Sequence, residues 1–365
     1  MGFTLKSDLA ERLLATLMEW DVPRFGVEVA RMQMLASLKY DEYGGYGPGV
    51  KFAENLARWL NQFEPDQREI AYGFVMSRLV FISDGEMAHL IDIAYPDLID
   101  PYLLNRSAAD IGLPTYKIAK IAEHPDYVSL RRRSLFLGLS DGARLDRLRR
   151  ASHLSHEQFG QDYEVHGDQA ERFKTELEKA LEAQHLPGDA TFRQIFLVDD
   201  FSGSGRTLLR PDADNAGKYK GKLVRFRERL DDLKSNGIVS EDVAVAVLLY
   251  VASEQSVEHL TEMKSKVGLD DWTVAVVQKI GRHLRVDLTD PSMAELCKEY
   301  YDPSSADEHK SDAPIGYDDC ALPLVLGHNT PNNSICLLWL ETDTIDGLGR
   351  KALFPRYERH HKDRP

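Results

Sequence analysis

The stretch from Phe192 to Leu209, FRQIFLVDDFSGSGRTLL, constrains the fold more than any other part of the chain. An apolar run over residues 195–198 is followed by two acids and then by a loop of small residues. A short apolar run that ends in a turn signal predicts a buried strand, and a strand covered on both faces is typical of a parallel sheet. Ligands of open parallel sheets bind at the carboxyl ends of the strands. We therefore expect a binding site directly after Val198.

The residues that follow this strand suit two different parts of one ligand. Glycine and serine residues can turn several backbone N–H groups toward an anion, and a helix beginning near Thr207 would add partial positive charge. Asp199 and Asp200, which we expect to lie at the strand end outside the apolar core, suit adjacent hydroxyl groups, or a metal ion held with them. Together these features predict a phosphorylated sugar. The competing interpretation is an ordinary glycine-rich turn, although two acids at the end of a buried strand require a partner.

The same stretch resembles the phosphoribosyl pyrophosphate (PRPP) loop of type I phosphoribosyltransferases. That family's pattern is a hydrophobic strand, two acids, a few residues and then Thr-Gly-x-Thr or a close variant. The resemblance implies that the acids hold the ribose hydroxyls, with Mg²⁺ as the metal at Asp199 and Asp200, and that the loop holds the 5′-phosphate. The residues assigned to PRPP are Asp199, Asp200, Ser202, Gly203, Ser204, Gly205, Arg206 and Thr207.

One position departs from the family pattern. Purine-salvage members carry an Asp just before the first Thr of the loop, where it meets the base, and this chain has Gly203 there. A general acid or base from that position is absent, which argues against a purine substrate. The sequence assigns no catalytic residue.

Composition limits the classes of protein that the chain can belong to. Its 365 residues allow two or three domains, and 43% hydrophobic with 28% charged residues is typical of a soluble globular protein. A net charge of −14 argues against nucleic acid as a partner. No apolar run approaches the roughly 18 residues of a membrane span, and the charged N-terminus predicts no signal peptide. Three widely spaced cysteines predict reduced thiols in the cytoplasm.

The order of predicted elements divides the chain in two. Residues 1–130 show helical periodicity and capping signals, among them Ser83 followed by Glu86, and form a predicted helical N-terminal region. Residues 131–365 form a predicted α/β domain with a parallel sheet flanked by helices. Its other predicted strands are Ser134–Leu139, Val243–Val251 and Trp272–Ile280.

A second loop follows the strand that begins at Ser134. In type I phosphoribosyltransferases such a strand, turn and helix upstream of the main motif supply the loop that contacts pyrophosphate. The resemblance makes Ser140, Asp141, Gly142 and Arg144 the candidates here. Backbone amides and an arginine can hold a pyrophosphate, while a normal turn with solvated cations is the alternative. A polar segment, His153–Val165, is a predicted flap.

The C-terminal segment, residues 315–358, is predicted to form a hood over the site. It contains Asn329, Asn332 and Asn333 between two apolar runs. Amide side chains donate and accept hydrogen bonds and so suit the edge of a base, whereas asparagine is also ordinary in loops.

Four segments together resemble a subgroup, the phosphoribosyltransferase-like proteins of bacterial conflict (anti-phage) gene clusters. They are SLFLGLSDGAR, VDDFSGSGRT, GYDDCALPLVLGHNTPNN and LFPR. The resemblance implies a bacterial cytoplasmic protein that binds PRPP or a nucleotide and works with a defence-system partner protein. Two functions stay open: transfer of phosphoribosyl to a base with release of pyrophosphate, or a catalytically inactive sensing module that signals to its partner.

Overall fold

The computed structural model describes residues 7–161, 165, 167–302, 313–342 and 349–356. The chain folds into two compact units. Unit 1 combines the two ends of the chain, residues 1–87 and 281–365, and unit 2 is the continuous stretch 88–280. The predicted boundary at residue 130 thus falls inside unit 2, and the predicted hood segment belongs to unit 1. Each unit is described by itself.

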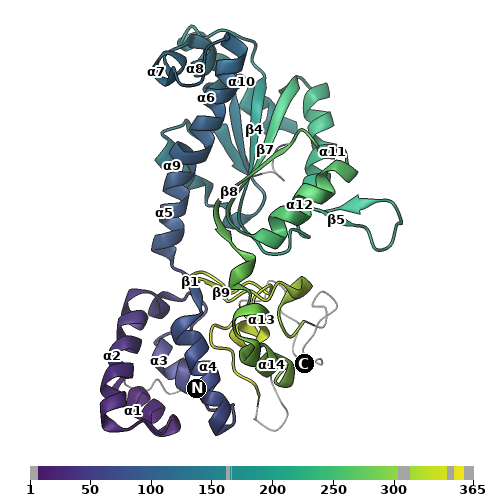
Figure 1. Ribbon diagram of the computed structural model, residues 1–365. Helices are drawn as coiled ribbons and strands as arrows, with labels where there is room; N and C mark the ends of the chain where they lie inside the picture. The colour runs from purple at the N-terminus through teal and green to yellow at the C-terminus, as the bar shows by residue number, and fades with distance from the viewer. Residues whose placement is uncertain (1–6, 162–164, 166, 303–312, 343–348, 357–365) are drawn as a thin grey trace. The chain divides into compact units, whose positions relative to one another are not determined.

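Unit 2 is built on a five-stranded sheet in which all neighbouring strands run parallel (Figure 1). Most residues of the three central strands are buried, as expected for a sheet that helices cover on both faces. From edge to edge the order is β3 (Phe159–Gln161), β2 (Ser134–Gly138), β4 (Phe192–Ser202), β7 (Val239–Ser253) and β8 (Thr273–Ile280).

The strand order places a reversal point inside this sheet. After β2 the chain passes to β3 on one side, and it then returns to β4 on the other side. Doubly wound sheets with this order bind ligands in the crevice between the two strands where the direction reverses, outside their carboxyl ends. The topology alone therefore directs attention to the residues that follow β2 and those at the end of β4.

Helices pack on both faces of the sheet. On one face, apolar residues of the strands form a core with α10 (Gly167–Ala183), α11 (Lys222–Ser235) and α12 (Glu254–Lys266). On the other face, Phe136 and Phe196 stack with ring centroids 4.9 Å apart, and Tyr102 of α6 packs edge-on against Phe196. Further helices of the chain are α5 (Asp84–Ala94), α6 (Asp100–Ile111), α7 (Ile118–Ala122), α8 (Pro125–Arg132) and α9 (Leu145–Ser152).

Unit 1 has one core built from both ends of the chain. Phe52 and Phe354 stack with centroids 5.9 Å apart, and the Trp59 indole N–H donates to the Leu337 carbonyl at 2.8 Å. Its helices are α1 (Ser7–Leu17), α2 (Val22–Leu38), α3 (Phe52–Leu60), α4 (Pro65–Ser77), α13 (Val286–Thr289), α14 (Pro291–Glu299) and α15 (Cys336–Trp339). Strand β1 (Val80–Ile82) pairs in parallel with β9 (Leu324–Leu326).

The structure confirms the predicted fold class, an α/β protein with a parallel sheet flanked by helices and a helical N-terminal region. The capping box is also confirmed, because the Glu86 N–H donates to the Ser83 hydroxyl at 3.1 Å and Ser83 N–H donates back to the Glu86 carboxylate at 2.9 Å. Part of the predicted flap is an edge strand, β3, while residues 162–164 lie outside the described residues. The second apolar run of the C-terminal segment forms α15.

Candidate functional site

Strand β4 continues through the two acids. The predicted strand ends at Val198, whereas the observed one pairs with β7 as far as Ser202. Pairing continues because β7 extends as far as Ser253 and stays in register beside it, with Asp199 opposite Leu249 and Phe201 opposite Val251. Successive side chains of a strand leave it on opposite sides. Asp199 and Asp200 therefore have different surroundings.

Asp199 is buried, with 3% of its surface exposed. Its carboxylate accepts a hydrogen bond from the Lys222 ammonium at 2.7 Å and another from the Ser140 hydroxyl. Burial raises the pKa of Asp199 above its ordinary value, and the nearby Asp200 adds to the rise, while Lys222 and Ser140 oppose it. The sequence-based expectation that both acids lie outside the core is wrong for Asp199.

Lys222 is a site residue that sequence reasoning missed. It is the first residue of α11, and 15% of its side chain is exposed. A polar segment separates it from the glycine-rich loop in sequence. No residue pattern marks the lysine, and only the return of the chain to the end of β4 could have placed it.

Asp200 contacts the second predicted loop. One of its carboxylate oxygens accepts the Phe201 N–H at 2.9 Å. The other lies against Gly142, where a Cβ atom would come within 2.5 Å of it. Because Ser140 also bonds Asp199, the loop after β2 reaches both acids. The structure thus brings together the two loops that were predicted separately, at the carboxyl ends of β2 and β4.

The loop after β2 is tight. Residues Asp141–Ala143 form a 3-10 turn that the Ala143 N–H closes onto the Ser140 carbonyl at 3.1 Å. Arg144 then adopts a left-handed conformation, with φ 45°. Such a conformation is uncommon for a residue with a Cβ atom, and it fixes the direction in which the chain enters α9.

The glycine-rich loop after β4 is held by two serines of the next strand and helix. The Ser253 hydroxyl donates to the Gly203 carbonyl, and the Ser256 hydroxyl lies 2.7 Å from that of Ser202. Ser253 also caps α12, because its oxygen accepts the Ser256 N–H at 2.9 Å. The bond from Ser253 to the loop had no signal in the sequence.

Gly205 has both a conformational and a packing role. Its φ is +78°, and a Cβ atom there would lie 3.1 Å from the Ser256 carbonyl oxygen and 2.9 Å from a ring carbon of His259. The His259 ring in turn bonds the Leu209 carbonyl at 2.7 Å. The loop is therefore packed closely on α12, and the absence of a side chain at position 205 is a requirement of the fold.

No helix begins at Thr207, so the partial positive charge that a helix end there would add does not reach the loop. The Leu208 and Leu209 N–H groups both donate to the Gly205 carbonyl at 3.0 Å and close a turn. A short hairpin follows, formed by β5 (Arg210–Pro211) and β6 (Tyr219–Lys220). The first N–H groups of α11 then donate to the Thr207 and Leu208 carbonyls at 3.1 and 3.0 Å. These helix-end donors are directed at the loop and not at an anion.

The comparisons with known proteins give one match. A family model described as PRTase-CE, a phosphoribosyltransferase-like domain, matches residues 56–356. The chain belongs to the PRTase-CE family. No curated protein and no solved structure matches. The family match begins well before residue 130, so the PRTase-CE domain includes helices of the predicted N-terminal region.

The asparagines proposed for base recognition lie in unit 1 of this PRTase-CE protein. Asn333 is 7% exposed, and its amide donates to the Tyr317 carbonyl at 3.2 Å and to the Cys320 sulfur at 3.3 Å. The Asn329 N–H closes a turn onto Leu326 at 3.0 Å, and the Asn332 carbonyl accepts the Tyr317 N–H at 2.7 Å. These bonds stabilise the C-terminal segment, and a role in base recognition stays a prediction.

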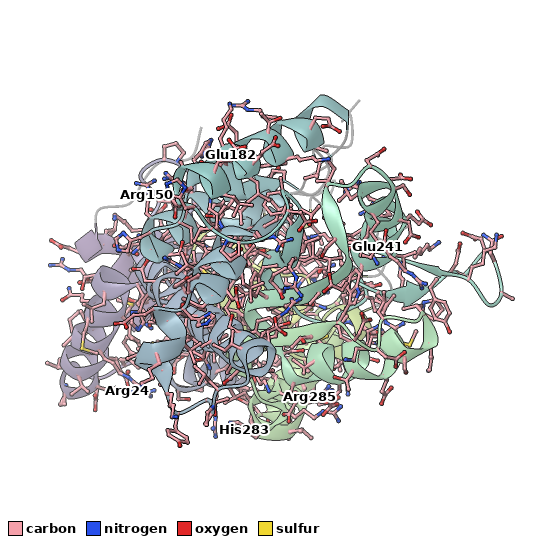
Figure 2. The ribbon with its side chains drawn as sticks, turned by 90° about the horizontal axis from the view of Figure 1, so that it is seen from above. Arg24, Arg150, Glu182, Glu241, His283 and Arg285 are labelled. Atoms are coloured by element: carbon pink, nitrogen blue, oxygen red, sulfur yellow. The ribbon has the colours of Figure 1, made fainter. Side chains whose placement is uncertain are left out.

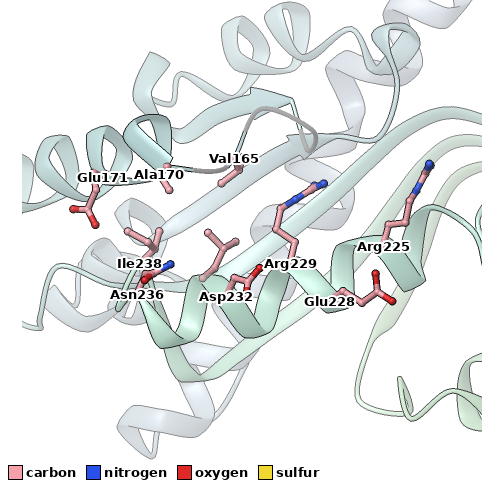
Figure 3. Close-up of a pocket in the computed structure, with 11 residues that line it drawn as sticks. Val165, Ala170, Glu171, Arg225, Glu228, Arg229, Asp232, Asn236 and Ile238 are labelled. Carbon is pink, nitrogen blue, oxygen red and sulfur yellow. The ribbon is translucent and has the colours of Figure 1, made fainter.

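Unit 2 of the PRTase-CE protein also has a cavity of about 710 Å³ away from the two loops. Figure 3 shows it between α10 and α11, with Glu171 on one side and Arg225 and Arg229 on the other. None of the residues assigned to PRPP, pyrophosphate or base lines it. Acidic residues and arginines both line the cavity. The cavity therefore lacks the net positive charge that would select an anion.

The basic helix that follows the loop of β2 is balanced by acids. Arg150, labelled in Figure 2, and Arg149 both pair with Asp146 on the same helix. Arg147 donates to Asp92 of α5 at 2.9 Å.

In the part of the chain that the structure describes, no helix is long and apolar enough to cross a membrane.

Proposed function

We propose that this PRTase-CE protein binds PRPP, or a nucleotide of the same ribose-phosphate chemistry, at the carboxyl ends of β2 and β4. The observation that carries the proposal is the convergence of the two loops at the reversal point of the sheet, with Ser140 on Asp199 and Gly142 on Asp200. Ligands of doubly wound sheets bind at such points, and the residues there combine phosphate-binding and hydroxyl-binding chemistry.

The proposed reaction is displacement of pyrophosphate from the anomeric carbon of PRPP. The bond from that carbon to the pyrophosphate oxygen breaks, a bond to a nitrogen of the acceptor base forms, and positive charge develops on the sugar ring between the two events. The loop after β4 would hold the 5′-phosphate, the loop after β2 the pyrophosphate, and Asp200 the ribose hydroxyls. Their contribution is positioning and charge stabilisation.

The donor set supports a magnesium ion only in part. Both oxygens of Asp199 accept hydrogen bonds, one from Ser140 and one from Lys222. Among the described residues no group of three or more His, Cys, Asp or Glu side chains gathers in a way that could hold a metal. Mg²⁺ is commonly held by one or two carboxylates together with substrate phosphates, and Asp200 is the acid that suits this arrangement. A bound ion would neutralise phosphate charge.

A second function, a sensor without turnover, is favoured by the Asp199–Lys222 pair. An acid that is buried and bonded to a lysine at 2.7 Å serves the fold, which leaves fewer groups for chemistry. In this case the chain would signal ligand binding to a protein partner. The resemblance to bacterial defence proteins suggests that this partner is another protein of a defence system.

Calorimetry and a pyrophosphate assay test the two functions together. PRPP is titrated into the full chain with and without Mg²⁺, and pyrophosphate release is then measured with a panel of bases. Binding with release supports the enzyme, and binding without release supports the sensor. If neither PRPP nor any nucleotide binds, the proposed site is wrong.

Gly142→Ala is expected to weaken PRPP binding about tenfold, or ~1.4 kcal/mol, with little loss of stability. The added methyl would lie 2.5 Å from the Asp200 carboxylate, which can move because it ends a side chain. Calorimetry and thermal unfolding measure the two effects. Gly73→Ala, where nothing lies within 4 Å of the new Cβ atom, is the matched control and should bind normally. Equal affinity in both variants would contradict a role for Asp200.

Arg206→Ala and Thr207→Ala are each expected to cost about 1–2 kcal/mol of PRPP binding, as for a hydrogen bond to a charged group. They should differ in salt dependence, because the arginine carries charge and the threonine does not. A salt titration of affinity should be flatter for Arg206→Ala than for wild type and unchanged in slope for Thr207→Ala. Identical slopes and affinities in all three proteins would place the phosphate elsewhere.

A further inference from the structure

Tyr250 lies beside Asp200 on the neighbouring strand. The register places Asp199 opposite Leu249 and Phe201 opposite Val251, so Asp200 and Tyr250 are opposite each other. Residues that are paired across adjacent strands project from the same face of a sheet. Tyr250 therefore projects from the face that carries the Asp200 carboxylate, at the carboxyl ends of the strands, and its residue is completely buried.

The Tyr250 hydroxyl has no hydrogen-bond partner among the residues that the structure describes. Buried tyrosine hydroxyls usually have a hydrogen-bond partner, and a buried polar group without one makes the free energy of folding less favourable. A phenylalanine would fill the same space without that cost. The hydroxyl is thus a feature that the packing of unit 2 does not explain.

The charges around the phenol are those of the proposed site. Burial raises the pKa of Tyr250, the charges of Asp200 and Asp199 raise it further, and Arg144 lowers it. The phenol therefore stays protonated and is a hydrogen-bond donor at neutral pH. The three charged groups belong to the acids of β4 and to the loop after β2, which are the parts that converge at the reversal point.

We propose that the Tyr250 hydroxyl donates a hydrogen bond to a ring hydroxyl of the ribose. The same ribose hydroxyl donates a hydrogen bond to the Asp200 carboxylate. A sugar hydroxyl can accept one hydrogen bond and donate another, so it can join a phenol to a carboxylate that the phenol does not bond directly. Tyr250 would then select a ligand with a sugar over a simple phosphate or pyrophosphate. This inference rests on the ribose-phosphate function proposed above.

The test is a double-mutant cycle of Tyr250→Phe and Asp200→Asn, read with two ligands. Calorimetry with PRPP should show about a tenfold loss of affinity for Tyr250→Phe, and the double variant should lose less than the product of the single losses, because both residues hold one hydroxyl. Affinity for inorganic pyrophosphate, which has no sugar, should be unchanged in Tyr250→Phe. Tyr116→Phe, on a tyrosine that is 76% exposed, is the matched control.

Three outcomes would overturn the inference. If Tyr250→Phe binds PRPP normally and unfolds at a lower temperature, the hydroxyl holds a structural water. If pyrophosphate and PRPP lose affinity together, the phenol supports the loop and not the sugar. If the two losses multiply without coupling, Tyr250 and Asp200 do not share a group. Failure of the wild-type protein to bind PRPP or any nucleotide would instead overturn the proposed function itself, and this inference with it.

Discussion

Lys222→Met is expected to lower the free energy of unfolding by about 3–5 kcal/mol at neutral pH, the usual cost of removing one partner of a buried ion pair. Lys222 lies 2.7 Å from Asp199, and the two side chains are 15% and 5% exposed. Without the ammonium, the Asp199 carboxylate is left buried, and among the described residues the Ser140 hydroxyl is the donor that remains to it. Urea unfolding of both proteins measures the difference.

The loss should depend on pH in a defined direction. The pKa of Asp199 is already raised in the folded protein, mainly by burial, and removal of Lys222 raises it further. A carboxyl with a raised folded pKa favours the folded state below its unfolded pKa of about 3.9 and loses that contribution as the pH rises through its folded pKa. The deficit of Lys222→Met relative to wild type should therefore shrink as the pH falls from 7 toward 4.

A double variant separates the ion pair from the packing around it. Asp199→Leu combined with Lys222→Met replaces both charges by apolar groups, and such replacements are often neutral or stabilising. The double variant should recover most of the lost stability. A double variant as unstable as Lys222→Met, with a deficit that does not change with pH, would show that Lys222 matters through its contacts and not through its charge.

Gly205→Val is expected to destabilise unit 2 by about 3–5 kcal/mol, because backbone strain and overpacking add at this position. The position has φ +78°, where a β-branched residue is strained, and a Cβ atom would meet the Ser256 carbonyl oxygen at 3.1 Å and His259 at 2.9 Å. The contact with the Ser256 carbonyl makes the substitution costly, because a backbone oxygen cannot move aside as a side chain can. Thermal unfolding gives the answer.

Gly217→Val is the matched control. Its φ is +80°, close to that of Gly205, but nothing lies within 4 Å of the added Cβ atom. It should therefore cost only the backbone strain, about 1–3 kcal/mol. Equal losses in the two variants would show that the loop after β4 is not packed on α12 as described.

The sheet could be predicted from the sequence because each central strand is a short apolar run between turn signals. Ser134–Leu139 and Val243–Val251 are such runs, and the structure has β2 and β7 there. Asp199 and Asp200 could be placed at a strand end from the sequence, because they directly follow the apolar run of β4. Their separate surroundings could not, because they depend on where β7 stops pairing and on which helix returns a cation to Asp199.

The remaining differences between the elements expected from the sequence and those in the structure arise from contacts between distant parts of the chain. Strand β1 has three residues and forms by pairing with β9, more than 240 positions later. The hairpin β5–β6 lies between the glycine-rich loop and α11, so the next helix after the loop begins at Lys222 and not near Thr207. Unit 1 joins both ends of the chain, and local periodicity cannot show which helices share a core.

The discontinuous core of unit 1 has a consequence for folding during synthesis. Helices α1 to α4 leave the ribosome before unit 2, but the residues that complete their core, such as Leu338 and Phe354, follow more than 260 residues after the end of α4 at Ser77. At ~5–20 residues per second, the apolar faces of these helices wait roughly 13–50 s for these partners. During translation unit 2 can close before unit 1, and the nascent N-terminal helices are the part of the chain most in need of a chaperone.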